Sequence, residues 1–383
     1  IHSFPDPNHI QYNARVQRVN LNTNRLTQVK AKTKPYNPEA GLDWWKTTKC
    51  KIVTFCIFGA LLVLTGILVP TLLGLFSKTP ATTPIIQIFW PFDGNTNDFY
   101  GTYNGTTVNS PTYFSAGITG YGSAINLVAA SSQSIVVSTY LNLASTSFTV
   151  ETWLYPTTTP SGDNAIFGQC ACTTCTDQCM YLVLRSGVLY MGFYGDNLAG
   201  VTSISANKWW HVAFVFDNSA STQTIYVNGV QDATRTSNSY KGTSGGLTLG
   251  TSAILTPNNY FNGYFDQMAF ISKARNASEL LDAATLTVYY TFDTLTSGNY
   301  SFDSGPNLIN GTGVGVTSAS SGRVNQALQF STSGAYFQVG GLILLATVNN
   351  PYSVSVWVKP TSLAGGSIIQ WSSANTGSGW CIG

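Results

Sequence analysis

An uncharged apolar stretch near the N-terminus constrains this chain more than any other feature. The 25 residues from Ile52 to Phe76 contain no charged side chain. At about 1.5 Å per residue they would form a helix of roughly 37 Å, enough to cross a hydrocarbon core of about 30 Å with some tilt. Pro70 would weaken a soluble helix but is tolerated within a bilayer. The stretch is therefore predicted to be a single transmembrane helix, in preference to a buried core helix or a cleaved signal peptide.

The charges on either side of this stretch predict its orientation. Residues 1–51 carry nine Lys and Arg against three Asp and Glu, a net charge of +6, whereas the rest of the chain carries nine against thirteen, a net charge of −4. Basic flanks stay in the cytoplasm. We therefore expect a type II signal anchor in the plasma membrane, with the N-terminus cytoplasmic and the chain after residue 76 extracellular.

The basic arm 1–51 has no hydrophobic periodicity, and its Asn, Pro, Lys and Arg content predicts disorder. Its basic side chains would either contact anionic lipid or serve only to set the topology. Cys50, beside the predicted span, is a candidate for palmitoylation.

Asn-x-Ser/Thr sequons agree with this topology, because all of them follow the apolar stretch. The predicted glycosylation sites are Asn104, Asn276, Asn299 and Asn310. Only 9% of the residues are charged and 13% are aromatic, which is typical of a β-rich extracellular protein.

Strand patterns begin after a Thr- and Pro-containing linker at 77–84. Residues 147–156 and 209–217 are β-branched and aromatic runs, and residues 224–234 read as strand, turn and strand. Asn228-Gly229 in that turn suits a type I′ hairpin. The longest helical pattern covers only 274–284. The chain is therefore predicted to be all-β, as a two-sheet antiparallel sandwich.

The strand region also repeats itself at offsets of 200 to 206 residues. The segment "FWPFDGN" (89–95) returns as "YYTFDTL" (289–295), and "SFTVETWLYP" (147–156) returns as "YSVSVWVKP" (352–360). This predicts one complete domain at 85–284 and a truncated second copy at 285–383. Half a sandwich leaves its inner sheet uncovered, so the second copy is not expected to fold stably alone. The chain begins with Ile1 and ends inside a repeat, which favours a fragment of a longer product.

A resemblance to a known family rests on "FTVETWLYP", "WWHVAFVFD", "TIYVNGV" and "GYFDQMAFISKARNASEL". These segments resemble the laminin G-like jelly roll of the concanavalin A-like lectin/glucanase superfamily, over 85–283 in full and 286–383 in part. The resemblance implies a two-sheet antiparallel jelly roll whose loops or concave face bind glycans or other extracellular ligands.

Because the superfamily includes glycoside hydrolases, an enzyme has to be considered. Retaining hydrolysis needs two carboxylates about 5 Å apart. In laminarinase-like members these come from an E-x-D-x-x-E strand, but Glu151 is followed by Thr, Trp and Leu, and Glu279 is the only other glutamate after the apolar stretch. His211, the only histidine after that stretch, is predicted to be packed within its strand rather than part of a triad. The covered sequence is therefore not predicted to be an enzyme.

Calcium is the one cofactor that the sequence suggests. Asp93, Asp98 and Asp266 resemble acidic positions near a structural calcium in some jelly rolls, and hard oxygen ligands suit that ion. Asp293 and Asp303 are their candidates in the second copy. The alternative is that these aspartates cap turns by accepting hydrogen bonds from backbone amides.

Four of the seven cysteines lie within ten positions: Cys170, Cys172, Cys175 and Cys179. Their spacing is too compressed for a zinc ribbon, and disulfides prevail outside the cell. The nested pairing, Cys170 with Cys179 and Cys172 with Cys175, is favoured. The two other pairings and a metal or thiol state stay open.

The second copy shows that the repeat does not require these cysteines. Cys381 aligns with Cys179, but Trp371 and Ser372 occupy the region of Cys170. The disulfides are therefore expected to stiffen a local feature of the first domain, either a binding edge or a site protected from proteolysis. Cys381 could pair with a residue beyond the sequence.

These features predict a cell-surface membrane protein whose lectin-like domains bind glycan or protein ligands in adhesion or recognition. The alternatives are a membrane-anchored enzyme whose catalytic domain lies beyond residue 383, with accessory binding modules, and a structural surface coat. Nucleic-acid binding is not predicted, because the region after residue 76 has no basic stripe. Fold alone does not identify the ligand-binding residues.

Overall fold

The computed structural model describes residues 84–382 apart from 256–258, 297–299, 343–350, 363 and 373–378. Within these residues no helix is long and apolar enough to cross a membrane. The arm 1–51 with Cys50, the stretch Ile52–Phe76 and nearly all of the linker 77–84 lie outside them. Membrane topology and arm disorder therefore stay predictions.

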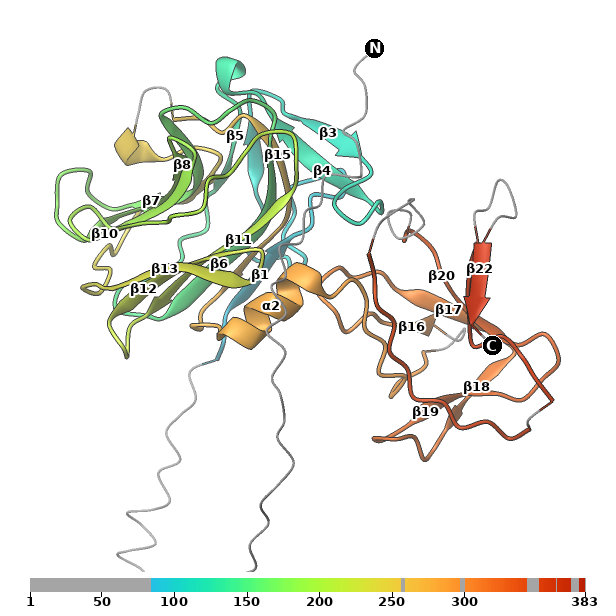
Figure 1. Ribbon diagram of the computed structural model, residues 1–383. Helices are drawn as coiled ribbons and strands as arrows, with labels where there is room; N and C mark the ends of the chain where they lie inside the picture. The colour runs from blue at the N-terminus through green and yellow to red at the C-terminus, as the bar shows by residue number, and fades with distance from the viewer. Residues whose placement is uncertain are drawn as a thin grey trace, which may run out of the picture. The chain divides into compact units, whose positions relative to one another are not determined.

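Two antiparallel sheets face each other in the first domain (Figure 1). Among the described residues the larger sheet has eight strands, in the order β13-β12-β11-β6-β15-β4-β3, with β1 also paired to β15. Its strands are β1 (Gln87–Trp90), β3 (Thr112–Ser115), β4 (Ser123–Leu127), β6 (Phe148–Pro156), β11 (Trp210–Asp217), β12 (Thr222–Val227), β13 (Val230–Thr236) and β15 (Gly263–Ile271).

The second sheet has seven strands among the described residues, in the order β10-β9-β8-β7-β14-β5-β2. They are β2 (Thr106–Val108), β5 (Ser134–Val137), β7 (Asp163–Cys170), β8 (Cys179–Arg185), β9 (Val188–Gly192), β10 (Asn197–Ala199) and β14 (Leu247–Leu249). Two short 3₁₀ turns, η3 (Ala129–Ser131) and η4 (Ala253–Leu255), lie in the connections. The predicted antiparallel all-β sandwich is confirmed, and its architecture is consistent with a jelly roll.

The core fills the space between the two sheets because each strand alternates its side chains between the two faces. Val150 and Leu154 of β6 and Phe214 of β11 are fully buried and share one core with Leu182 of β8. Every buried member of this core lies between residues 88 and 270. The first domain therefore supplies a complete core from its own residues.

Local predictions within this domain also hold. Asn228 and Gly229, which connect β12 to β13, have φ angles of 50° and 74°, as a type I′ turn requires. The predicted helix is α2 (Ala277–Thr285), which Asn276 caps in a reciprocal capping box with Glu279.

Helix α2 lies against the outer face of the eight-stranded sheet (Figure 1). Its Leu280 is fully buried against Ala213, Val215 and Tyr226 of β11 and β12. The apolar side of a short helix gains most of its stability from such packing. The half of this sheet face formed by β11 and β12 is therefore covered by protein.

The second copy forms several small sheets. Its strands are β16 (Tyr300–Ser301), β17 (Gly311–Val314) and β20 (Tyr336–Val339) in one sheet, β18 (Val316–Ala319) with β19 (Ala327–Phe330), and β21 (Ile369–Ser372) with β22 (Gly379–Ile382). The sequence repeat extends to backbone conformation, because Phe92 and its counterpart Phe292 have positive φ angles of 59° and 57°.

The two copies differ at the segment that forms the central strand β6 in the first domain. Strand β6 is buried at every position, whereas its counterpart 352–360 forms no strand in the structure and is exposed throughout. Trp357 in that segment is 77% exposed. The described part of the second copy therefore leaves apolar side chains of this segment in contact with solvent.

Candidate functional site

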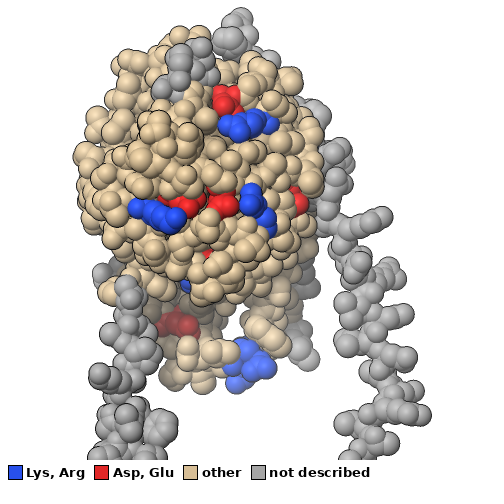
Figure 2. Space-filling view, turned by 90° about the vertical axis from the view of Figure 1, so that its left-hand side faces the viewer, with Lys and Arg blue, Asp and Glu red and all other residues tan. Residues whose placement is uncertain are grey.

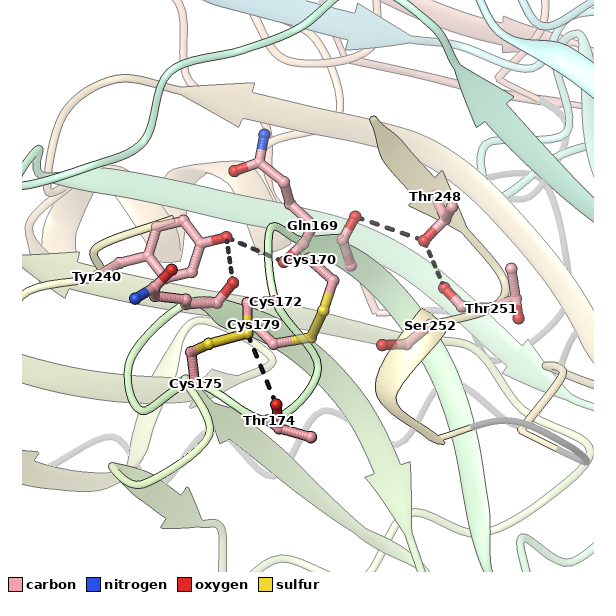
Figure 3. Close-up of a disulfide and its surroundings, with 12 residues drawn as sticks. Gln169, Cys170, Cys172, Thr174, Cys175, Cys179, Tyr240, Thr248, Thr251 and Ser252 are labelled. Atoms are coloured by element: carbon pink, nitrogen blue, oxygen red, sulfur yellow. Dashed lines mark hydrogen bonds between the residues drawn. A yellow bond between two sulfur atoms is a disulfide. The ribbon is translucent and has the colours of Figure 1, made fainter. Parts of the chain in front are cut away.

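The four clustered cysteines form two nested disulfides where the interior strands β7 and β8 of the seven-stranded sheet are connected (Figure 3). Cys170 and Cys179 are directly opposite each other where β7 and β8 pair. Cys172 and Cys175 are joined within the loop between these strands. The favoured pairing is the one found. We call the loop 171–178 and its two disulfides the cysteine edge.

Hydrogen bonds fix the cysteine edge to the body of the domain. The Tyr240 hydroxyl donates to the backbone carbonyl oxygens of Gln169, at 3.0 Å, and Gln178, at 3.4 Å (Figure 3). Tyr240 itself is fully buried in the main core. The start and the end of the loop are therefore held by one core side chain.

Asp177 provides a second anchor for the same loop. Its backbone N–H donates to the carbonyl of Tyr194, and its own carbonyl accepts from the backbone N–H of Lys241. Its buried carboxylate forms an ion pair with Lys241 at 2.9 Å. With the loop fixed, Thr173, Thr174 and Thr176 are exposed. The cysteine edge thus presents neutral hydroxyl groups on a rigid frame.

Asp98, one of the three predicted calcium ligands, has the alternative role of capping a turn. Both of its carboxylate oxygens accept hydrogen bonds from backbone amides, at 3.0 to 3.2 Å. The donors are Phe89, Tyr100, Thr102 and Tyr103. Asp303 in the second copy repeats this arrangement, accepting from the amides of Tyr289, Gly305 and Ile309.

Asp93 and Asp266, the other two candidates, both contact the segment 116–123. Oδ2 of Asp266 accepts from the backbone N–H of Ile118 at 2.7 Å, and Oδ1 of Asp93 accepts from that of Ser123 at 2.8 Å. Asp293 in the second copy repeats the bond of Asp93, by accepting from the amide of Gln326 at 3.2 Å. The fold therefore brings two distant acids to one loop.

The electrostatics of this pair suit a bound cation. Burial, with the nearby charge of Asp93, raises the pKa of Asp266 well above its ordinary value. Burial also raises the pKa of Asp93. Among the described residues, however, no group of three or more His, Cys, Asp or Glu side chains is arranged to hold a metal ion. A calcium ion here would also need backbone oxygens, which it accepts as ligands.

Glu151 and His211 lie together on the outer face of the eight-stranded sheet, and both are buried. Glu151 forms an ion pair with Arg275, and its Oε2 lies 4.0 Å from Nε2 of His211. Burial raises the pKa of Glu151 to about 7 and lowers that of His211 to about 3. His211 is 2% exposed and packs edge-on against Trp153, so the predicted packed strand histidine is confirmed.

Arg275 holds the carboxylate of Glu151 at its buried position. Besides Glu151, it donates to the backbone carbonyl of Glu279 in α2 at 2.7 Å. Glu279 in turn is bound by Lys273 and by the amide of Asn276. Glu151 and Glu279, which were considered above as catalytic acids, therefore take part in the contacts that connect helix α2 to the sheet.

The sequence predictions missed a group of aromatic side chains on the outer face of the eight-stranded sheet. Tyr155 contacts both Trp209 and Tyr264, with 5.5 Å between ring centroids in each case. Phe114 lies 5.1 Å from Tyr264. We call Phe114, Tyr155, Trp209 and Tyr264 the aromatic row. The sequence shows aromatic residues at the alternate positions Trp153 and Tyr155 of β6, but it does not show that Tyr155 meets Trp209 and Tyr264.

Charged groups are few on the face of the first domain that Figure 2 shows, and five of the six basic side chains of this domain form ion pairs. Among its described residues the ion pairs are Arg185–Asp163, Arg235–Asp196, Lys241–Asp177, Lys273–Glu279 and Arg275–Glu151. Much of the remaining surface offers hydroxyl, amide and aromatic groups.

The predicted glycosylation sites fall into different environments. Asn104 and Asn276 are exposed, and Asn310 is half-buried. Oδ1 of Asn104 accepts from the amide of Asp98, and Oδ1 of Asn310 accepts from that of Asp303. Asn299 lies outside the described residues.

A match to a family model supports this fold assignment. Residues 129–281 match the family model of the concanavalin A-like lectin/glucanases superfamily. A comparison with curated proteins finds no match. Among solved structures, the chain is similar to domain 4 of AbnA, a GH43 extracellular arabinanase from Geobacillus stearothermophilus in complex with arabinotriose. That match has 19% identity, covers 52% of this chain and 97% of that one, and has a TM-score of 0.43.

Two toxin binding domains are also similar. The binding domain of Paraclostridial Mosquitocidal Protein 1 is 14% identical, over 65% of this chain and 68% of that one, with a TM-score of 0.42. The botulinum neurotoxin DC binding domain, in complex with rat synaptotagmin II, is 13% identical over 67% and 71%, with a TM-score of 0.41. Residues 129–281 of the first domain therefore match a family model of the concanavalin A-like lectin/glucanases superfamily, and the antiparallel two-sheet sandwich is consistent with that match.

Proposed function

We propose that this chain is a type II single-pass membrane protein of the cell surface, whose extracellular lectin-like domain binds glycan or protein ligands in adhesion or recognition. The cysteine edge carries the proposal. Nested disulfides persist in oxidising compartments and are rare in the cytosol. Cys170 and Cys179 would therefore lie on the extracellular side, which is where the basic arm and the apolar stretch Ile52–Phe76 would direct them.

The recognition part of the proposal rests on rigidity and surface chemistry. Two disulfides and the Tyr240 hydroxyl hold this loop in place, and a domain that is rigid before binding loses little conformational entropy when it binds a ligand. With most of its few basic side chains in ion pairs, the domain offers mainly neutral hydrogen-bonding and aromatic groups on its surface. These are the groups by which binding sites orient small polar ligands.

Expression of the full chain in mammalian cells tests the topology. Peptide N-glycosidase should increase its gel mobility, and the shift should become smaller in Asn104→Gln and Asn276→Gln variants. Surface biotinylation should label the C-terminal side, and an epitope at the N-terminus should be reached only after permeabilisation. A glycan-free chain with an N-terminus accessible on intact cells would refute the topology.

Ligand binding is tested with residues 84–285, which contain a complete core. The secreted domain should bind a glycan class on an array or a protein on the surface of cells. A folded, monodisperse domain that binds neither would contradict the recognition function and favour a structural coat.

We also propose that Asp93 and Asp266 hold a structural calcium ion, together with backbone oxygens. Their proximity and raised pKa values support this assignment. Calcium should raise the melting temperature of the domain, and Asp266→Asn should abolish that rise. Asp282→Asn, at an exposed position of α2, is the matched control. An equal response of Asp266→Asn and wild type would exclude Asp266 as a ligand.

A further inference from the structure

We propose that the aromatic row is the ligand-binding surface of the first domain and that it binds a neutral oligosaccharide. The inference rests on the recognition function proposed above and deepens it, by naming a site and a chemical class. It depends on four observations: the alignment of side chains across the sheet, the packing and exposure of the rings, their unused hydrogen-bonding groups and the absence of charge among the aligned side chains.

Strand register places the side chains in one line. Thr112 of β3 is opposite Asn126 of β4, Asn126 is opposite Tyr264 of β15, and Tyr264 is opposite Tyr155 of β6. Neighbours along these strands, such as Leu127 and Phe265, belong to the core between the sheets. Because side chains alternate between faces, the line must lie on the outer face.

The length of the line suits more than one sugar ring. Adjacent strands lie about 4.8 Å apart, so a row across four strands spans about 14 Å. Trp209, which directly precedes β11, extends the row past Tyr155. A ligand on this surface would therefore cross the strands, with successive rings over successive side chains.

The rings are held firmly but are not fully covered. Tyr155 is only 6% exposed and forms the floor of the row. Trp209 and Tyr264 pack on it from two sides, with their own centroids 6.4 Å apart, and both remain half-exposed. Ring faces carry negative partial charge, which attracts the weakly positive C–H groups on one face of a sugar. Such preorganised rings need no rearrangement to bind.

Three polar groups in the row have no partner in the part of the chain that the structure describes. The phenol hydroxyls of Tyr155 and Tyr264 and the indole N–H of Trp209 form no hydrogen bond with any described residue. Asn126 at the end of the row donates to the Thr112 hydroxyl at 3.2 Å and keeps its carbonyl oxygen available. Donors and acceptors beside stacking rings are what recognition of a polyol requires.

The chemistry of the line points to a neutral ligand. None of Thr112, Asn126, Tyr264, Tyr155 and Trp209 is charged. An acidic glycan would need an arginine or lysine to replace its hydration. The nearest basic residue in sequence, Lys208, has its ammonium group 3.8 Å from the ring centroid of Trp210, a core residue. The other half of this sheet face is covered by α2.

The experiment uses the secreted domain 84–285 on a glycan array that holds neutral, sialylated and sulfated oligosaccharides. Wild type should bind neutral members. Trp209→Ala and Tyr264→Ala should each weaken binding about tenfold, the scale expected for loss of one aromatic contact. Tyr264→Phe keeps the ring and loses only the hydroxyl, so its loss should be smaller. Should Trp209→Ala fail to fold, Trp209→Phe keeps one aromatic ring and removes the indole N–H with part of the stacking surface, and it should also weaken binding.

Tyr194→Ala is the matched control, because Tyr194 is an exposed aromatic residue beside the cysteine edge. It should bind like wild type. Loss of binding in Tyr194→Ala, with the row variants unaffected, would overturn the site while leaving the recognition function intact. Binding restricted to sialylated or sulfated glycans would overturn the ligand class. A wild-type domain that binds a protein but no glycan would overturn this inference without refuting the proposed function.

Discussion

At the scale of single residues, aspartates stabilise turns of this fold by accepting hydrogen bonds from backbone amides. Asp98 accepts four amide hydrogen bonds and so closes the turn after β1. Asp303 does the same in the second copy, and each is paired with an asparagine, Asn104 or Asn310. The same residue types at the same spacing thus build the same turn twice. This turn explains the conserved spacing of the repeat without invoking a metal.

Asp98→Ala should lower the free energy of unfolding of the 84–285 domain by about 2–4 kcal/mol. The substitution leaves four backbone amides without their charged acceptor. One hydrogen bond to a charged group contributes about 1.5–3 kcal/mol, and the sum over four bonds is reduced because the amides of exposed Tyr100 and Thr102 can bind water instead. Urea unfolding followed by tryptophan fluorescence measures the change. Asp282→Ala, at an exposed site, should change stability by less than about 0.5 kcal/mol. Equal effects of the two substitutions would show that the turn does not depend on Asp98.

The burial of His211 predicts how the stability of the first domain depends on pH. Burial lowers its folded-state pKa from 6.5 to about 3, so the unfolded chain binds a proton that the folded chain does not. Stability is therefore lost as the pH falls below 6.5, at up to about 1.4 kcal/mol per pH unit. Glu151, whose pKa is raised to about 7, acts in the opposite direction, because its contribution is lost as the pH rises from 4.5.

The contribution of His211 is isolated by comparing wild type with His211→Phe. Phenylalanine can occupy the same site against Trp153, and Nδ1 of His211 has no hydrogen-bond partner among the described residues. The difference in unfolding free energy should move in favour of the variant as the pH falls from 6.5 to 4.5. A difference independent of pH would mean that His211 is protonated in the folded chain.

At the scale of elements, the two disulfides have different tasks. Cys170–Cys179 joins the ends of β7 and β8, and Cys179 is fully buried. Cys172–Cys175 lies in the loop and is partly exposed. The outer disulfide therefore closes the strand pair, and the inner one shapes the surface of the cysteine edge.

Removing the outer disulfide should cost more stability than removing the inner one. The chain-entropy model gives about 2.7 kcal/mol for a ten-residue loop and about 1.9 kcal/mol for a four-residue loop. We expect Cys170→Ala/Cys179→Ala to lower the melting temperature more than Cys172→Ala/Cys175→Ala. Differential scanning calorimetry of both double variants decides the order, and the reverse order would place the main constraint in the loop.

At the scale of the whole molecule, the two copies of the repeat differ in burial. Strand β6 is enclosed between β11 and β15 in the first domain. Its counterpart 352–360 in the second copy has no strand partner among the described residues, and Val356 and Trp357 are 53% and 77% exposed. Similar sequences thus reach different states, because a strand is stabilised by its neighbours.

A chain of residues 84–383 should expose more apolar surface than the domain 84–285. The fluorescence of 1-anilinonaphthalene-8-sulfonate should increase with the longer chain and stay low with the shorter one. Trp357→Ser should reduce that increase, because it removes a large exposed apolar side chain. Tyr100→Ser, at an exposed aromatic site of the first domain, is the control. Equal dye binding by both chains would contradict the burial difference.

The sequence by itself determined what local pattern and chemistry can specify. The β-branched and aromatic runs at 147–156 and 209–217 predicted β6 and β11, Asn228-Gly229 predicted the hairpin turn, and the cysteine spacing favoured the nested disulfides. Each of these depends on residues close in the chain, so the information lies within a short window.

Only the tertiary structure decided which distant residues meet. Asp93 and Asp266 approach one loop, Glu151 is held by Arg275, and Tyr264 stands opposite Tyr155, because β15 inserts between β4 and β6. In an antiparallel sandwich the order of strands in a sheet differs from their order in the chain, and alternation fixes the face of a side chain but not its neighbours. For that reason the sequence suggested Asp93, Asp98 and Asp266 as calcium ligands without showing which of them meet, and it did not show the aromatic row as a unit.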